Sequence, residues 1–163
     1  LEVVLEKAPR TYSDAEKLEL AAWKNDTYRR LLANMSPADL SDEVKTTLEI
    51  LRVKGMPMAI GSSSKNAPFI LERIGLAGFF DAVSDGNNIT RSKPDPEVFL
   101  VAAKKLELPP EECLVVEDAA AGIEAAKAGG MKSLGVGPFH ESLGADYHSE
   151  TLATVTNWEE ILW

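Results

Sequence analysis

Short apolar segments alternate with amphipathic helices along most of this chain, and this alternation restricts its fold more than any other feature. The expected segments, in chain order, are helices at 42–54, 68–75, 97–106 and 120–128, interleaved with strands at 56–61, 81–84, 113–117, 132–136 and 153–156. A last short helix is expected after Asn157, with Glu160 completing its cap. Strands that alternate with helices predict a parallel, doubly wound α/β sheet of the Rossmann-like class, covered on both faces.

The first 38 residues follow a different pattern and predict a separate helical segment. Residues 13–33 form an amphipathic pattern that opens with a capping box of Ser13 and Glu16. Residues 1–6 are expected to be the end of a preceding helix. A polar break with Pro37 at the start of a turn follows. We therefore expect a helical segment at 1–38 and an α/β unit at 39–163.

Composition argues against several classes of protein. The formal net charge of −9 disfavours binding to the phosphate backbone of nucleic acids, although a few placed basic groups suffice for a small phosphorylated ligand. No apolar run in these residues is long enough to cross a bilayer, and we expect no secretory signal before the first helix. Cys113 is the only cysteine, so no intrachain disulfide can form. We expect a cytoplasmic protein that binds neither nucleic acid nor membrane.

Polar side chains gather after the predicted strands, at the edge where open α/β sheets bind ligands. The first group, directly after the strand at 56–61, consists of Ser62, Ser63, Ser64, Lys65 and Asn66. These hydroxyl, amine and amide groups run into a helix N-terminus, which suits an anion. For this stretch alone, an ordinary turn with Asn66 as the helix cap is an equally good interpretation.

Two further groups carry charge. Lys93 precedes Pro94, which favours an extended conformation, and its ammonium can bind phosphate; a solvated loop lysine is the simpler interpretation of this residue alone. Glu117 and Asp118 close an apolar strand, where hard oxygen ligands favour Mg²⁺ completed by substrate phosphate and water. Asp118 can also cap the following helix. Because each group follows its own strand, together they favour one shared phosphate site.

These stretches resemble the motifs of the haloacid dehalogenase superfamily and, within it, of its β-phosphoglucomutase subfamily. The matching stretches are KND at 24–26, SPAD at 36–39, SSSKNAPFIL at 62–71, SKPDPEVF at 92–99, VEDAAAGIEAAKAGG at 116–130 and LGAD at 143–146. The resemblance covers nearly the whole chain. It implies part of a helical cap domain at 1–38 and the superfamily's α/β core at 39–163.

The resemblance implies a role for each candidate residue. Ser62 matches the phosphate-binding hydroxyl, and Lys93 matches the lysine that offsets charge on the transferring phosphoryl group, so both are expected to be catalytic. Glu117 and Asp118 match the acidic pair of the Mg²⁺ site. The expected phosphate- and substrate-binding residues are Ser62, Ser63, Ser64, Lys65, Asn66, Lys93 and Lys24. For Lys24, a solvated helix lysine is the alternative.

The chain departs from the superfamily in one major respect. It contains no Asp-x-Asp-Gly motif, whose aspartates the resemblance implies to be the nucleophile and the general acid–base. Asp85-Gly86 follows a different strand and does not match that motif. In the superfamily the motif follows the central strand of the sheet, so the strands ending at Gly61 and Asp118 should face a gap.

Such a gap carries an energetic cost. Each unpaired buried amide costs about 1–3 kcal/mol, and the sum is comparable with a domain's whole stability of about 5–15 kcal/mol. We therefore predict that these residues alone do not form a continuous doubly wound sheet. An N-terminal segment outside this sequence is expected to complete it; the alternatives are a strand from a second chain or a rearrangement of the remaining strands.

The resemblance implies a phosphomutase that interconverts β-glucose 1-phosphate and glucose 6-phosphate through a phosphoaspartyl enzyme. It would use Mg²⁺ and a small phosphorylated sugar, and act as a monomer when full length. These residues alone are expected to be inactive. Two alternatives stay open: a sugar-phosphate or phosphoglycolate phosphatase on the same scaffold, and a non-catalytic phosphate-binding remnant.

Overall fold

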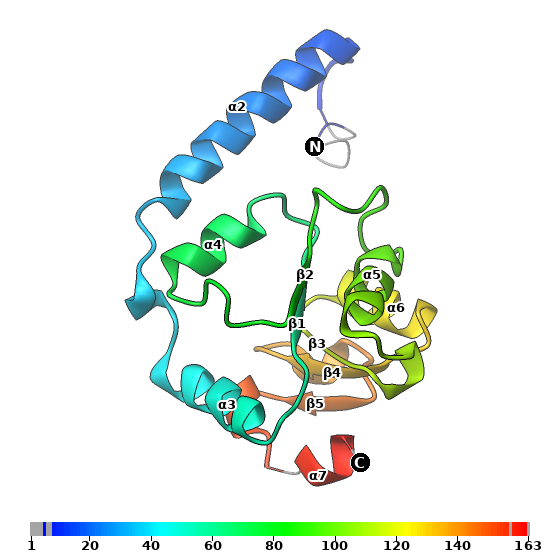
Figure 1. Cartoon of the computed structure of the whole chain (residues 1–163). Helices are drawn as coiled ribbons and strands as arrows, with labels where there is room; N and C mark the ends of the chain where they lie inside the picture. Colours follow the sequence, from blue (N-terminus) through cyan, green and yellow to red (C-terminus); the bar gives the residue numbers. More distant parts are fainter. Residues whose placement is uncertain (1–4, 6–7, 157, 163) are drawn as a thin grey trace.

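Helices and strands alternate through the chain in the computed structural model, which describes residues 5, 8–156 and 158–162 (Figure 1). The α-helices are α2 (Asp14–Leu32), α3 (Asp42–Val53), α4 (Ala67–Arg73), α5 (Glu97–Leu106), α6 (Ala120–Ala128) and α7 (Trp158–Leu162). The strands are β1 (Ala59–Gly61), β2 (Ala82–Ser84), β3 (Leu114–Glu117), β4 (Lys132–Val136) and β5 (Tyr147–Ser149). Short 3₁₀ helices are η1 (Pro37–Asp39), η2 (Pro110–Glu112), η3 (His140–Ser142) and η4 (Leu152–Thr154). In this described part, no helix has the length and apolar character of a membrane span.

Helix α2 confirms the helix predicted at 13–33. Its capping box forms as expected, because Glu16 N donates to Ser13 Oγ and Ser13 N donates to the Glu16 carboxylate. The backbone bond from Ser13 is the largest cause that lowers the pKa of Glu16 to about 2. Figure 1 shows α2 extending away from the strands. Leu18, Trp23 and Leu31 are 72%, 66% and 62% exposed, so described residues leave much of its apolar surface uncovered.

The strands are parallel, as predicted, but they form separate sheets. One sheet pairs β1 with β2 and places Ile60 beside Val83. The other has the order β3-β4-β5 and places Leu134 beside Tyr147. Within the described residues, one edge of β1 and one edge of β3 lack a neighbouring strand. The prediction of an interrupted sheet is therefore confirmed.

An apolar cavity of about 390 Å³ lies between the two sheets. It is lined by residues 58–61 around β1, by residues 113–116 around β3, and by Phe99 and Leu106 of α5. The two strand edges predicted to face a gap thus lie on opposite sides of an apolar space. Helix α5 contacts both β1 and β2, and α6 contacts β3 and β4, so these helices hold the sheets at the sides of the cavity.

The prediction of a strand at 153–156 is wrong. A second capping box, in which Thr154 N donates to Thr151 Oγ1 and Thr151 N donates to Thr154 Oγ1, turns the backbone into η4 at that point. The third strand of the sheet is instead β5, whose sequence Tyr-His-Ser lacks the apolar run that marked the other strands. The expected cap at Asn157 and most of the helix expected at 1–6 fall outside the described residues.

Candidate active site

Lys93 connects the carboxyl ends of the two sheets. Its ammonium donates to Gly61 O of β1 at 3.1 Å and pairs with the Glu117 carboxylate at the end of β3. Only 17% of the Lys93 side chain and 9% of the Glu117 side chain are exposed. The Phe99 ring lies 4.5 Å from the ammonium and adds a cation–π contact. One buried charge therefore joins β1 to β3 across the interruption of the sheet.

Glu117 is held from several directions. Its second carboxylate oxygen accepts from Asp118 N at 3.0 Å and Ala119 N at 3.3 Å. On the other side lies Gly122 of α6, where an added Cβ would overlap the Glu117 carboxyl group. Glycine at 122 is therefore required for this carboxylate to stay directed at Lys93.

The loop that carries Lys93 is fixed by Glu97, a residue that the sequence patterns did not single out. The Glu97 carboxylate accepts from Thr90 N at 3.1 Å, from Thr90 Oγ1 at 3.0 Å and from Arg91 N at 2.6 Å. The backbone bonds from Thr90 and Arg91 are the main causes that lower the pKa of Glu97 below its ordinary value. Its ionised carboxylate, at the start of α5, thus holds the backbone that precedes Lys93.

In the loop after β1 (residues 62–66, the serine loop), hydroxyl donors remain available. Ser64 N donates to Ser62 Oγ, and Asn66 N donates to Ser64 Oγ, each at 3.1 Å. Each hydroxyl oxygen therefore accepts a backbone N–H, while its own O–H remains able to donate to an anion. Ser62 directly follows Gly61, whose carbonyl binds Lys93. The structure thus brings together the start of the serine loop, Lys93 and the acidic pair that begins with Glu117.

Asn66 contacts the helical segment. It is 5% exposed, its Nδ2 donates to Asn25 Oδ1 at 2.9 Å, and its Oδ1 accepts from Arg29 at 3.4 Å. Asn66 does occupy the N-cap position of α4, as the simpler interpretation expected, but its side chain makes no cap bond to that helix. Lys24, next to Asn25, is exposed. Asn25 was missed because the KND stretch gave no sign of which of its side chains meets the core, and Arg29 was missed because it lies outside that stretch.

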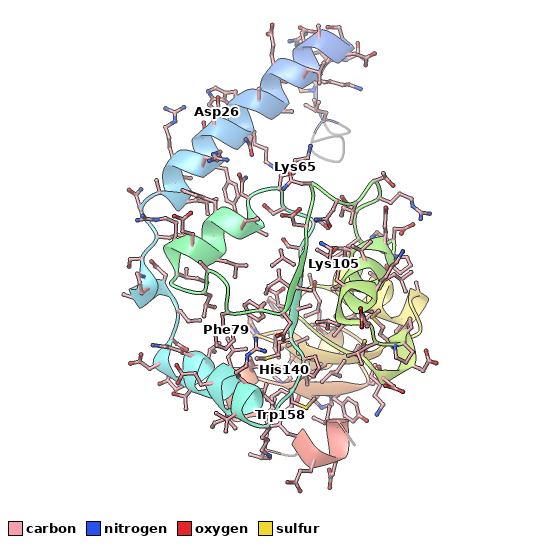
Figure 2. All side chains as sticks on the ribbon, viewed as in Figure 1. Asp26, Lys65, Phe79, Lys105, His140 and Trp158 are labelled. Carbon is pink, nitrogen blue, oxygen red and sulfur yellow. The ribbon has the colours of Figure 1, made fainter. Side chains whose placement is uncertain are left out.

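The exposed members of the serine loop are Ser63 and Lys65. Figure 2 shows Lys65 at the end of the core nearest α2. Its ammonium has no ion pair with the described residues and is available to a ligand.

The two predicted Mg²⁺ ligands differ in their contacts. Both oxygens of Glu117 are engaged by Lys93 and backbone amides, whereas the Asp118 side chain is exposed and bonds to none of the described residues. The described residues contain no group of three or more His, Cys, Asp or Glu side chains that could hold a metal. A single carboxylate suits Mg²⁺ when phosphate and water complete the coordination shell of the ion. Asp118 therefore fits as a ligand of the ion, whereas Glu117 is the ion-pair partner of Lys93.

The first prediction concerns the buried ion pair. Glu117→Ala should lower the free energy of unfolding of the full-length protein by about 3–5 kcal/mol, because it leaves the Lys93 ammonium buried without its counter-ion. Asp118→Ala, the matched control, removes an exposed neighbouring carboxylate and should change it by no more than about 0.5 kcal/mol. Urea denaturation measures both. Equal effects of the two substitutions would contradict the assignment of Glu117 as the partner of Lys93.

The second prediction concerns pH. Because the folded-state pKa of Glu97 lies below its ordinary value of 4.5, its contribution to stability is complete above that value and is lost as the pH falls through the lowered pKa. Glu97→Gln should therefore be less stable than the parent near neutral pH, and the difference should shrink on acidification below pH 4.5. Thermal unfolding across pH tests this. Glu72→Gln, an exposed carboxylate on α4, is the control, and a pH-independent effect at Glu97 would contradict the prediction.

Comparison with known proteins identifies the family of this chain. A model of haloacid dehalogenase-like hydrolases matches residues 3–130. The β-phosphoglucomutase of Bacillus subtilis is 40% identical over 139 residues, which cover 85% of this chain and 62% of the relative. A fructose-1-phosphate phosphatase of Escherichia coli is 35% identical over 127 residues, covering 76% of this chain and 65% of the relative. The chain thus spans less than two thirds of the length of these curated relatives.

Solved structures give the same result. A β-phosphoglucomutase from Clostridium difficile superimposes with a TM-score of 0.87 at 30% identity, covering 96% of this chain and 71% of that one. The α/β arrangement is therefore that of a known fold. The resemblance inferred from the motifs is confirmed, and the chain belongs to the haloacid dehalogenase-like hydrolase family.

Proposed function

We propose that the protein containing these residues is a phosphomutase that interconverts β-glucose 1-phosphate and glucose 6-phosphate. The observation that carries the proposal is the Lys93 ammonium, bonded to Gly61 O beside the hydroxyls of the serine loop. This arrangement offers one fixed positive charge and several O–H donors to a single phosphoryl group. The 40% identity to a β-phosphoglucomutase supports the choice of reaction within the family.

Each residue of the site has a distinct task in the proposed reaction. Ser62 Oγ donates to an oxygen of the transferring phosphoryl group, and Lys93 offsets the negative charge that builds up on that group. Glu117 keeps the Lys93 side chain extended toward the phosphoryl position. Asp118 would hold Mg²⁺, which when bound neutralises phosphate charge and orients the phosphoryl oxygens.

The nucleophile of a phosphoaspartyl mechanism is not among these residues, because the sequence contains no Asp-x-Asp-Gly motif. We propose that a segment outside the 163 residues carries it, as a strand between β1 and β3. Two observations support this position. The free strand edges line the same apolar cavity, and Lys93 spans its carboxyl end.

The helical segment would close the site. Asn25 and Arg29 of α2 hold Asn66, so the helix is tied to the loop that binds phosphate. Lys24, Lys65 and the exposed Ser63 lie on these two segments and would bind the sugar phosphate. Exclusion of water by such a cap protects a phosphoenzyme from hydrolysis. We further propose a monomeric, cytoplasmic enzyme, in keeping with the acidic charge and the absence of a disulfide.

A phosphatase acting on sugar phosphates is the second candidate. It is favoured by the 35% identity to a fructose-1-phosphate phosphatase. The same hydroxyls, lysine and metal-binding carboxylate would serve hydrolysis, and the two reactions differ in whether water or a sugar hydroxyl attacks the phosphoaspartate. The mutase is preferred because the cap is anchored directly to the phosphate loop through Asn66.

The third prediction tests the function with the full-length protein, incubated with Mg²⁺, β-glucose 1-phosphate and a catalytic amount of β-glucose 1,6-bisphosphate. Glucose 6-phosphate should form with little release of inorganic phosphate. Lys93→Ala should lower kcat by about 10²–10³-fold, the range found when one charge-stabilising donor is removed. Phosphate release without isomerisation would favour the phosphatase, and the absence of both activities would favour a non-catalytic protein.

A further inference from the structure

Asp85, in the turn after β2, is a buried carboxylate that the proposed reaction does not use. It is 3% exposed and has no cationic partner among the described residues. One of its oxygens accepts from Asn87 N at 2.8 Å and Asn88 Nδ2 at 3.3 Å, and the other accepts from Asn87 Nδ2 at 3.2 Å. A buried carboxylate satisfied only by amide groups fixes the geometry of the turn that supplies them.

The same turn binds the backbone of the serine loop at successive positions. Ser62 N donates to Ser84 O at 2.9 Å, and Gly86 N donates to Ser64 O at 3.3 Å. Asn87 Nδ2 donates to Lys65 O at 3.1 Å, in addition to its bond with Asp85. The Asn87 amide is therefore a bridge from the buried carboxylate to the loop.

Gly86 makes this contact possible. A Cβ at this position would lie 2.6 Å from Ser63 O and 2.9 Å from Lys65 N, distances that real Cβ atoms do not adopt. The turn and the loop therefore pack backbone against backbone. Because the contact uses Ser64 O and Lys65 O, the Ser62, Ser63 and Ser64 hydroxyls and the Lys65 ammonium remain free to bind an anion.

We infer that Asn87, held by Asp85, is a positioning residue that fixes the serine loop for binding a phosphate monoester. It would act through the carbonyl of Lys65 and would not touch the substrate. The inference deepens the proposed function and rests on it for the identity of the ligand. The positioning itself is a property of the free protein and can be measured without a ligand.

Two matched substitutions separate positioning from general stability. Asn87→Ala removes the bridge to Lys65 O, whereas Asn88→Ala removes bonds to Ser84 and Asp85 within the same turn but none to the serine loop. Both side chains are exposed, so neither change leaves a cavity. Since both variants lose bonds to Asp85, they are comparable in their effect on the turn.

The fourth prediction uses ¹⁵N relaxation of amides 63–66 in the full-length protein without ligand. Asn87→Ala should lower their order parameters from about 0.85 toward 0.6, while Asn88→Ala should leave them unchanged. Unchanged order in Asn87→Ala, or an equal loss in both variants, would overturn the inference.

A titration with inorganic phosphate on the same samples gives the functional readout. Asn87→Ala should weaken phosphate binding by about 3- to 10-fold, the value of one hydrogen bond, and Asn88→Ala should not. If the parent chain binds no phosphate, the proposed anion site fails in this form, whereas the relaxation result still decides the role of Asn87. If phosphate affinity and the unfolding midpoint fall together, and by the same amount in both variants, then Asn87 is a structural residue and not a positioning residue.

Discussion

The contact of the Lys93 ammonium with Gly61 O and the Glu117 carboxylate is the interaction on which the rest of this structure depends. It joins sheets that share no strand pairing in the described residues. It also fixes where the ends of β1 and β3 lie relative to each other, and therefore where the serine loop and Asp118 meet. A buried ion pair is weak support for stability, but it restricts geometry strongly, since either charge left alone is costly.

Around this contact, separate pieces of backbone are held by side chains that never reach the ligand position. Glu97 fixes the loop before Lys93, Gly122 leaves room for Glu117, and Asn87 holds the carbonyl of Lys65. The site is thus built from precise positioning of a few donors at one edge of the fold. Such preorganisation is what phosphoryl transfer requires, because the protein's contribution to that chemistry is mostly placement and charge.

Much of this arrangement could be predicted from the sequence. The alternating pattern predicted the parallel strands and helices, and Ser13 with Glu16 marked the start of α2. The strand β5 was missed because its Tyr-His-Ser sequence carries no apolar run. The sequence also could not predict which of Glu117 and Asp118 pairs with Lys93. Successive side chains of a strand point in opposite directions, and only the structure tells which one meets Lys93.

The central claim is that a phosphoryl group binds between the serine loop and Lys93, at the carboxyl ends of β1 and β3. A crystal structure of the chain soaked with tungstate, a phosphate mimic located by its anomalous scattering, tests this most directly. The account predicts a tungstate whose oxygens lie within about 3 Å of both Ser62 Oγ and Lys93 Nζ, the distance of a hydrogen bond. A peak bound elsewhere on the molecule, with that position filled only by water, would contradict it.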